Sequence, residues 1–309
     1  MPELPDIEAY LHALAPRVIG KALRGIRFAN PFLLRSVSPK PDAVTDCRAT
    51  TLRRIGKRVA IGFDNDHWLV LHLMIAGRLH WARAGAPIPG GKRGLAAFDF
   101  ETGSLILTEA GTKKRASLHL VDSSAGLAAH DPGGIDPLTC SAEAFAAAVR
   151  SANHTLKRIL TDPRLFSGIG NAYSDEILHR ARLSPVAMSQ KLDETGMARL
   201  HAATADVLNE WRDRLCAEAE GAWPDNVTAF RPEMATHGKF GQPCPVCAAP
   251  VQRIRYAENE TDYCPRCQTG GRILADRSLS RLLKRDWPRT LEALEQSGLA
   301  RRGTTARQN

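Results

Sequence analysis

The sequence predicts a multidomain α+β protein in which a β-rich region, a helical region and a cysteine-bound ribbon follow one another. Short runs of β-forming residues recur up to residue 121, and helical periodicity dominates from about residue 140 to residue 222. Two CxxC pairs then stand near the end of the chain. With 309 residues, of which 43% are hydrophobic, the chain is long enough for about two domains with buried cores.

A helix is expected ahead of the β-rich region. Residues 6–18 place Ile7, Leu11, Leu14 and Val18 at helical spacing. Runs of β-forming residues follow, separated by turn signals, at 58–63, 68–74, 77–83, 95–100, 104–109 and 117–121. Short strands at this density favour an antiparallel sandwich or a barrel.

A turn-rich segment at 128–139 is typical of a linker, and helices are expected beyond it. Ser141 is a suitable N-cap for the first of them. Further helical runs cover residues 154–162, 174–183 and 192–221. The Gly-rich loop 163–171 leads into a helix N-terminus, where free N–H groups suit a phosphate. A loop of this kind can equally be a purely structural turn.

The two CxxC pairs have the spacing of a zinc site. Cys244 and Cys247 are followed, after sixteen residues, by Cys264 and Cys267. Each pair offers two thiolates from a tight knuckle, and four thiolates complete a tetrahedral shell. Because no position is left open for water, we expect one structural Zn²⁺ per chain rather than a catalytic metal. The alternative is a set of free or disulfide-bonded cysteines.

The charge balance indicates a polyanionic partner. Lys and Arg outnumber Asp and Glu by 42 to 33, for a net charge of +9. Nucleic acid is the leading candidate, and the alternative is a basic enzyme with a small acidic substrate. The start of the chain lacks the features of a signal peptide, and no apolar run reaches about 18 residues. Zinc-type cysteine pairing argues against a secreted disulfide scaffold. We therefore expect a cytoplasmic, nucleoid-associated protein in a reducing compartment, without membrane contact.

Three motifs together resemble the Fpg/Nei family of DNA glycosylases. They are MPELPDIE at the start, GIGNAYSDEIL in the helical region and CPVC…CPRCQ near the end, and their order and spacing span residues 1–268. The resemblance implies an N-terminal catalytic β-sandwich domain at 2–135 and a helix–two-turn–helix domain at 136–232. It further implies a zinc ribbon at 233–268, which a basic extension at 269–309 follows.

The resemblance also implies where the chemistry lies. Once Met1 is removed, Pro2 has a free secondary amine, and an α-amino group has a pKa of about 7.7–8.0. Such an amine is partly neutral at physiological pH and can form a Schiff base with the sugar C1′. Glu3 is similar to the family's proton-transfer residue, Asp6 stands where the family usually has Glu, and Lys57 matches a lysine that contacts phosphate near the nucleophile. Taken alone, Pro2 and Glu3 could simply begin a helix.

Other positions match residues that hold DNA or fill the gap left by a flipped nucleotide. The expected DNA-binding residues are Lys157, Asn171, Tyr173, Met74, Ile75, Lys113, Lys114, Arg115 and Arg255. Two loops are expected to fill this gap. The first is the turn with Met74 and Ile75, and the second, at 109–116, has no aromatic residue. Asn259 stands where the family carries a phosphate-binding Arg. Arg255 is the leading candidate to compensate, followed by Arg272, Arg277 and Arg281 of the extension.

The implied function is that of a bifunctional DNA glycosylase and AP lyase. It would excise damaged, oxidised bases from double-stranded DNA as a monomer and cleave the abasic site by β/δ-elimination. The alternative is a weakly catalytic or non-catalytic relative that binds lesions or unusual DNA structures. An RNA-binding zinc-ribbon factor would leave the N-terminal motif unexplained.

Overall fold

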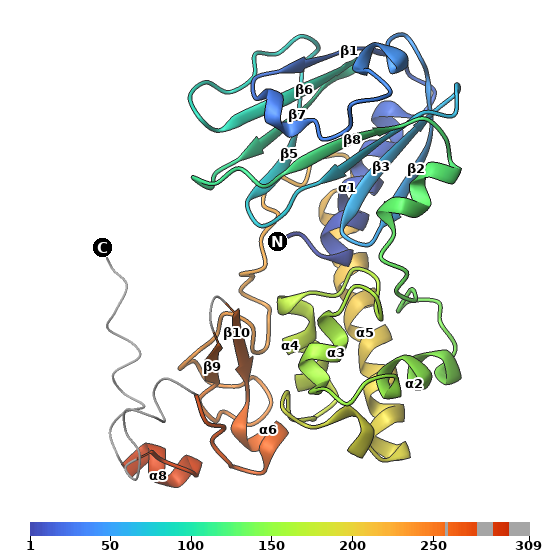
Figure 1. Cartoon of the computed structure of the whole chain (residues 1–309). Helices are drawn as coiled ribbons and strands as arrows, with labels where there is room; N and C mark the ends of the chain where they lie inside the picture. Colours follow the sequence, from blue (N-terminus) through green and yellow to red (C-terminus); the bar gives the residue numbers. More distant parts are fainter. Residues whose placement is uncertain (257–258, 277–286, 297–309) are drawn as a thin grey trace. The chain divides into compact units, whose positions relative to one another are not determined.

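The computed structural model describes residues 1–256, 259–276 and 287–296, which fall into two compact units (Figure 1). The first, here called the sandwich unit, comprises Met1–Gly134 and Asn209–Thr228. The second, here called the helical unit, comprises Ile135–Leu208 and the described residues from Ala229 onward. None of the helices in these ranges combines the length and the apolar character needed to cross a bilayer.

Two four-stranded antiparallel sheets form the sandwich unit, with strand orders β1-β6-β7-β5 and β2-β3-β4-β8. The strands are β1 (Leu23–Phe28), β2 (Ala49–Ile55), β3 (Arg58–Phe63), β4 (Trp68–His72), β5 (Gly77–Ala82), β6 (Gly94–Phe100), β7 (Gly103–Glu109) and β8 (Ser117–Val121). All six runs expected from the sequence are strands, and the architecture is a sandwich rather than a closed barrel. β1 and β2 were not expected, because both are mostly half-buried and interrupted by arginines.

Helix α1 (Leu4–Val18) packs on β2 and β3 and contributes to the core of the sandwich unit. Its Ile7, Leu14 and Val18 are fully buried, as the helical spacing predicts. Burying each such side chain contributes roughly 1.5–3 kcal/mol, so this face fixes the helix to the sheet. The N-terminal turn of α1 is thereby held in one place.

The segment 209–228 belongs to the sandwich unit through an aromatic contact. The Trp223 indole N–H donates to the carbonyl of Leu79 at 2.8 Å. Its ring lies 5.8 Å from that of Tyr10 and 6.1 Å from that of Trp81, measured between centroids. A buried indole usually requires such a hydrogen-bond partner.

The helical unit contains α2 (Ala142–Arg150), α3 (Leu156–Thr161), α4 (Asn171–Arg180) and the first part of α5 (Glu194–Glu218). Ser141 caps α2 as expected, since its hydroxyl accepts from the Ala144 N–H at 3.2 Å. The expected linker 128–139 is not entirely irregular, because a 3₁₀ helix at Ala125–His130 extends into it.

The ribbon consists of β9 (Gln252–Tyr256), β10 (Asn259–Tyr263) and the short α6 (Pro265–Thr269). The described part of the extension ends in α8 (Leu291–Gln296) and packs on this ribbon. The Ile273 N–H donates to the Arg289 carbonyl, and the Leu291 N–H to the Gly271 carbonyl, each at 2.9 Å. Ile273, Leu291 and Leu294 are buried in one cluster with the zinc-site cysteines, so this part is more than a polar tail. Arg277 and Arg281 lie outside the described residues.

Candidate functional site

The first turn of α1 buries the expected catalytic residues of the N-terminus. Pro2 is buried, Glu3 is 3% exposed and Asp6 is 2% exposed. The Asp6 carboxylate accepts from the Glu3 backbone N–H at 2.8 Å. Glu3 is the N-cap of α1 and Asp6 its N3 residue, and each side chain accepts from the backbone N–H of the other in a capping box.

The amino group at the chain start has an unusual electrostatic environment. Burial lowers the pKa of the Met1 amine, and the neighbouring Glu3 carboxylate raises it again in part. The charges of Arg78 and Lys57 lower the same pKa further. A larger share of the amine is thus neutral near pH 7 than in a solvated chain terminus. Arg78 was missed in the sequence, where it appears only as a cation after the turn that ends at Gly77.

Lys57 lies in the two-residue hairpin turn between β2 and β3. Ile55 pairs with Arg58 across the turn, and Gly56 has a φ of 58°. Positive φ at the first turn residue suits the right-handed twist of a tight hairpin, and glycine adopts it without a steric cost. The turn places Lys57 at the tip of the hairpin, and its expected contact with a phosphate stays a prediction.

The turn between β4 and β5 carries Met74 and Ile75. Met74 is half-buried with a φ of 54°, whereas Ile75 is 58% exposed. Ile75 is therefore the apolar side chain that this turn presents to solvent. A Cβ on Gly77 would lie 2.2 Å from the Leu73 carbonyl oxygen, so only glycine fits there. Arg78 donates to the carbonyls of Gly77 at 2.7 Å and Ile75 at 3.2 Å.

The loop from Ala110 to Ala116 is folded around a buried carboxylate. Glu109, 2% exposed, accepts from the backbone N–H of Arg115 at 3.0 Å and of Ala116 at 3.2 Å. The Lys114 ammonium donates to the Glu109 carbonyl. Lys114 thus supports the loop, while the other two basic residues expected here, Lys113 and Arg115, are exposed. Glu109 was missed in the sequence, although it directly precedes the basic loop.

The two loops that are expected to fill the gap lie side by side in the sandwich unit. Gly77 pairs with Glu109 at the ends of β5 and β7. The Ala110 N–H also donates to the Ala76 carbonyl at 3.4 Å. The structure therefore brings together Ile75 and the basic loop, which are far apart in the sequence.

In the helical unit, Lys157 and Asn171 meet at the start of α4. The Lys157 ammonium donates to the Asn171 carbonyl at 2.6 Å and to the Asp175 carboxylate at 2.5 Å. The Lys157 side chain is 12% exposed, and Tyr173 is 1% exposed. Tyr173 is thus an interior residue of this structure, and its expected contact with DNA stays a prediction.

Asp175 joins Lys157 to the loop before the ribbon. Burial raises the pKa of this carboxyl, and the Lys157 charge opposes that effect. His237 Nδ1 lies 2.8 Å from the second Asp175 oxygen. Asp262 lies in the same cluster and accepts from Arg253 at 2.8 Å. Because two cations already neutralise the two carboxylates, an ion-pair network accounts for this cluster better than a metal does.

A pocket of about 480 Å³ opens between α3 and the ribbon. The side chains that line it include Lys157, Arg158, Arg255 and His154. Arg255 is 59% exposed and donates to Glu260 at 2.9 Å across the hairpin, so part of its charge is neutralised. The side chain of Asn259 lies outside the described residues. Whether Arg255 compensates for Asn259 stays a prediction.

The four ribbon cysteines form a compact cluster. Their Sγ atoms all lie within 4.8 Å of one another, with 3.9 Å between Cys244 and Cys267 and 3.3 Å between Cys247 and Cys264. Burial raises the pKa of Cys267 to about 11, so this thiol needs a cation to become a thiolate. The donor set therefore fits zinc. His179 of α4, missed in the sequence, lies 3.3 Å from the Cys244 sulfur.

Comparison with protein families agrees with this geometry. Residues 1–122 match the formamidopyrimidine-DNA glycosylase N-terminal domain, and residues 134–211 match the H2TH domain of the same glycosylases. Residues 241–270 match the zinc finger found in FPG and IleRS. Together with the cysteine cluster, this match identifies one structural zinc per chain.

Individual relatives cover most of the chain. The formamidopyrimidine-DNA glycosylase of Variovorax paradoxus is 30% identical over 282 residues, or 87% of this chain and all of that protein. A formamidopyrimidine-DNA glycosylase-like protein of Mycobacterium tuberculosis is 40% identical over 151 residues, or 49% of this chain and 94% of that protein.

Solved structures share the fold. Lactococcus lactis Fpg bound to DNA with an abasic site has a TM-score of 0.75 at 24% identity, covering 86% of this chain and 99% of that chain. The same enzyme bound to N7-benzyl-Fapy-dG DNA has a TM-score of 0.77 at 24% identity and covers 87% and 100%. The predicted fold class is thereby confirmed, and the chain belongs to the formamidopyrimidine-DNA glycosylase family.

Proposed function

We propose that this DNA repair glycosylase removes damaged bases from double-stranded DNA and then cleaves the abasic site through a Schiff base on Pro2. The observation that best supports this proposal is the environment of the amino terminus. Burial and the charges of Arg78 and Lys57 lower the pKa of the Met1 amine, which adjoins Pro2, and the Glu3 carboxylate is close enough to raise it in part. A neutral amine next to a carboxylate is the pair that imine chemistry requires.

The proposed reaction begins when the Pro2 nitrogen lone pair forms a bond to C1′. The glycosidic bond breaks, and the base leaves with its electron pair and takes up a proton. The alkylated Pro2 nitrogen gives up its N–H proton to a base, and its lone pair then forms a double bond to C1′. The C1′–O4′ pair moves onto O4′, which is protonated, and an iminium remains at C1′. The iminium acidifies the C2′ protons, so loss of one expels the 3′ phosphate. A second elimination releases the 5′ phosphate.

Glu3 is the proposed proton carrier for these steps. Its side chain adjoins the amine, and carboxylates serve as general acids and bases at such positions. Asp6 has a supporting role in this proposal, because it completes the capping box of the helix that presents Pro2 and Glu3. Lys57 would hold a phosphate close to the reacting sugar.

Residues of both units are proposed to contact the DNA. In the region 2–135, Ile75 and the basic loop would fill the gap left by the flipped nucleotide. In the regions 136–232 and 233–268, Lys157, Asn171 and Arg255 would hold the backbone. The exposed basic residues and the pocket between α3 and the ribbon support this assignment.

A borohydride trapping assay on a panel of damaged-base and abasic duplexes tests the function. The proposal expects a covalent protein–DNA adduct together with strand-cleavage products. Glu3→Gln should slow base release by about two orders of magnitude or more while the protein still binds abasic DNA. Tight binding without adduct or cleavage on any lesion would instead support the non-catalytic relative.

A further inference from the structure

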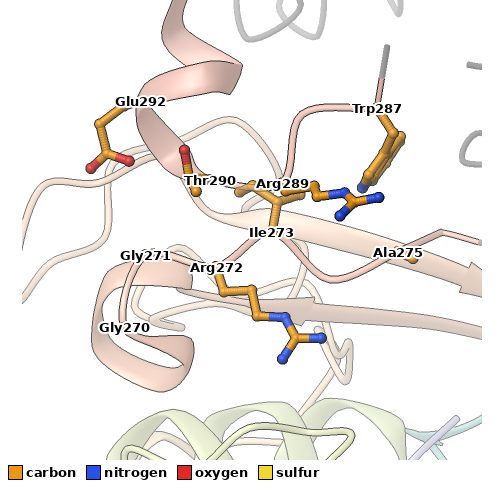
Figure 2. A pocket seen from close by; sticks show the side chains of 9 residues that line it. All are labelled: Gly270, Gly271, Arg272, Ile273, Ala275, Trp287, Arg289, Thr290 and Glu292. Carbon is orange, nitrogen blue, oxygen red and sulfur yellow. The ribbon is translucent and has the colours of Figure 1, made fainter. Parts of the chain in front are cut away.

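The extension beyond the ribbon forms a pocket. Of the residues expected to bind DNA, only Arg272 lines it. Its volume is about 630 Å³, and Figure 2 shows the side chains around it. Arg272 and Ile273 lie on one side, and Trp287 and Arg289 contribute the other. Two backbone hydrogen bonds hold these segments together: the Ile273 N–H donates to the Arg289 carbonyl, and the Leu291 N–H donates to the Gly271 carbonyl. The pocket is therefore a built feature of the extension rather than a gap between loose segments.

Two positive charges in this pocket have no counter-charge among the residues that the structure describes. Within the described ranges, the guanidinium groups of Arg272 and Arg289 make no hydrogen bond or ion pair, and both residues are exposed. The one acid of the lining, Glu292, points away from them in Figure 2. Its pKa is lowered by its own backbone N–H and by Thr290, so its charge serves the start of α8.

A third donor in the pocket is also unsatisfied. The Trp287 indole nitrogen is buried and has no hydrogen-bond partner in the described part of the chain. A buried N–H without an acceptor costs about 1–3 kcal/mol, so such groups usually have a partner in the functional state. Figure 2 shows this nitrogen on the side of the ring that faces Arg289. The missing partner should therefore be an acceptor, and its neighbours favour an anion.

The pocket adjoins the surface proposed to hold DNA. Ala275 lines both this pocket and the one that contains Lys157 and Arg255. A strand that follows the first set of cations can thus continue directly to Arg272 and Arg289. Both pockets belong to the helical unit.

We propose that Arg272, Arg289 and Trp287 form an accessory subsite for a DNA backbone phosphate, which lengthens the footprint of the protein along the duplex. The two guanidiniums supply charge-assisted hydrogen bonds and the indole N–H supplies a third donor. The subsite rests on the proposed function only in that its ligand is the same DNA. It takes no part in catalysis.

Binding of a duplex with an abasic-site analogue, measured over a range of salt concentrations, tests the subsite. Arg272→Gln combined with Arg289→Gln should weaken binding roughly tenfold and reduce the log–log salt slope by about 0.9 per phosphate released. Arg199→Gln is the matched control, because this exposed arginine of α5 lines neither pocket. Equal affinities and slopes for the double variant and the control would overturn the proposal.

A second measurement uses the unaltered chain. The indole N–H resonance of Trp287, assigned with Trp287→Phe, should shift when the duplex is added. Inorganic phosphate alone is the comparison titrant. No shift with DNA, or a shift with inorganic phosphate only, would exclude a backbone phosphate as the ligand.

The same samples separate this subsite from the catalytic proposal. The double variant should still form the borohydride adduct at saturating DNA, because Pro2 is unchanged. If wild-type protein forms no adduct but shows the salt and resonance effects, the subsite stands and the lyase proposal fails. If the adduct forms and both effects are absent, the lyase proposal stands and the subsite proposal fails.

Discussion

Arg78 is a residue whose charge acts on the amino group of Met1, which adjoins the proposed nucleophile. It lowers the pKa of the amino terminus and is fixed by hydrogen bonds to the carbonyls of Ile75 and Gly77. Removing this charge should raise the pKa of the amine, so that less of it is neutral near pH 7. Arg78 thereby couples the gap-filling turn to the proposed nucleophile.

The pH dependence of trapping tests this coupling. With Arg78→Ala, the rising limb of the trapping rate should move to higher pH, because the amine loses its proton later. Arg78→Lys keeps the charge and should leave the limb near its wild-type position. Identical profiles for Arg78→Ala and wild type would show that the arginine is only structural.

Lys57 should act on binding rather than on the amine alone. At the tip of its hairpin it is expected to neutralise one phosphate. Lys57→Ala should therefore lower the log–log salt slope of duplex binding by about one unit. Lys92→Ala, an exposed lysine in the loop before β6, is the control and should leave the slope unchanged. Equal slopes for the two variants would remove Lys57 from the DNA contacts.

The motifs of the sequence indicated Pro2, Glu3, Lys57 and the cysteines because these residues lie in short, characteristic segments. Arg78, Glu109 and His179 could not be found in this way. Each acts through a partner brought near by folding, as when His179 meets Cys244 across 65 positions of sequence. A single buried polar residue in a strand or helix gives no local pattern from which to infer such a partner.

At the level of elements, the basic loop depends on β7 more than on its own residues. The Glu109 carboxylate at the end of this strand binds two backbone N–H groups of the loop. Because the carboxylate is buried, its removal leaves those donors unsatisfied. The loop should then lose the conformation in which it lies beside the turn of Ala76 and Gly77.

Urea denaturation measures this dependence. Glu109→Ala should reduce the free energy of unfolding by about 2 kcal/mol, from two lost charge-assisted hydrogen bonds and the cavity left behind. Asp206→Asn, an exposed acid on α5, should change it by about 0.5 kcal/mol or less. A Glu109→Ala protein as stable as Asp206→Asn would refute the carboxylate's role in holding the loop.

Runs of β-forming residues predicted β3 to β8, and in β3, β4, β6 and β7 consecutive residues are buried on both faces. β1 and β2 carry arginines that are held by ion pairs, such as Arg27 with Asp99 at 2.6 Å and Arg54 with Glu8 at 2.7 Å. These partners lie on other elements, so hydrophobic periodicity alone could not reveal the two strands. The four-part domain division stays a prediction.

For the whole molecule, residues of the zinc ribbon connect it to the rest of the helical unit. Cys244 contacts His179 of α4, and Gln268 donates to the Leu183 carbonyl at 2.9 Å. The extension packs on the same cysteine cluster. The sequence predicted the metal but not this packing, since the few apolar residues of the extension form a core only against the ribbon.

Zinc removal should therefore loosen more than the ribbon. Chelation or Cys264→Ser should lower the melting temperature and abolish tight DNA binding. Without the metal, the ribbon that carries Arg255 should no longer be held against the helices of the helical unit, among which Lys157 lies. Cys140→Ser, outside the cluster, should retain one zinc and normal affinity. Metal-free protein with undiminished affinity would show that the zinc has no part in the DNA-binding surface.

The central claim is that the reaction passes through the amine of Pro2. Borohydride-trapped adduct on an abasic duplex should be digested with nuclease and protease and analysed by mass spectrometry. The account predicts that the sugar remnant is attached to a peptide that begins at Pro2, with Met1 absent, and that Pro2→Thr lowers the adduct yield sharply. A remnant on a lysine such as Lys57, or an adducted peptide that retains Met1, would contradict it.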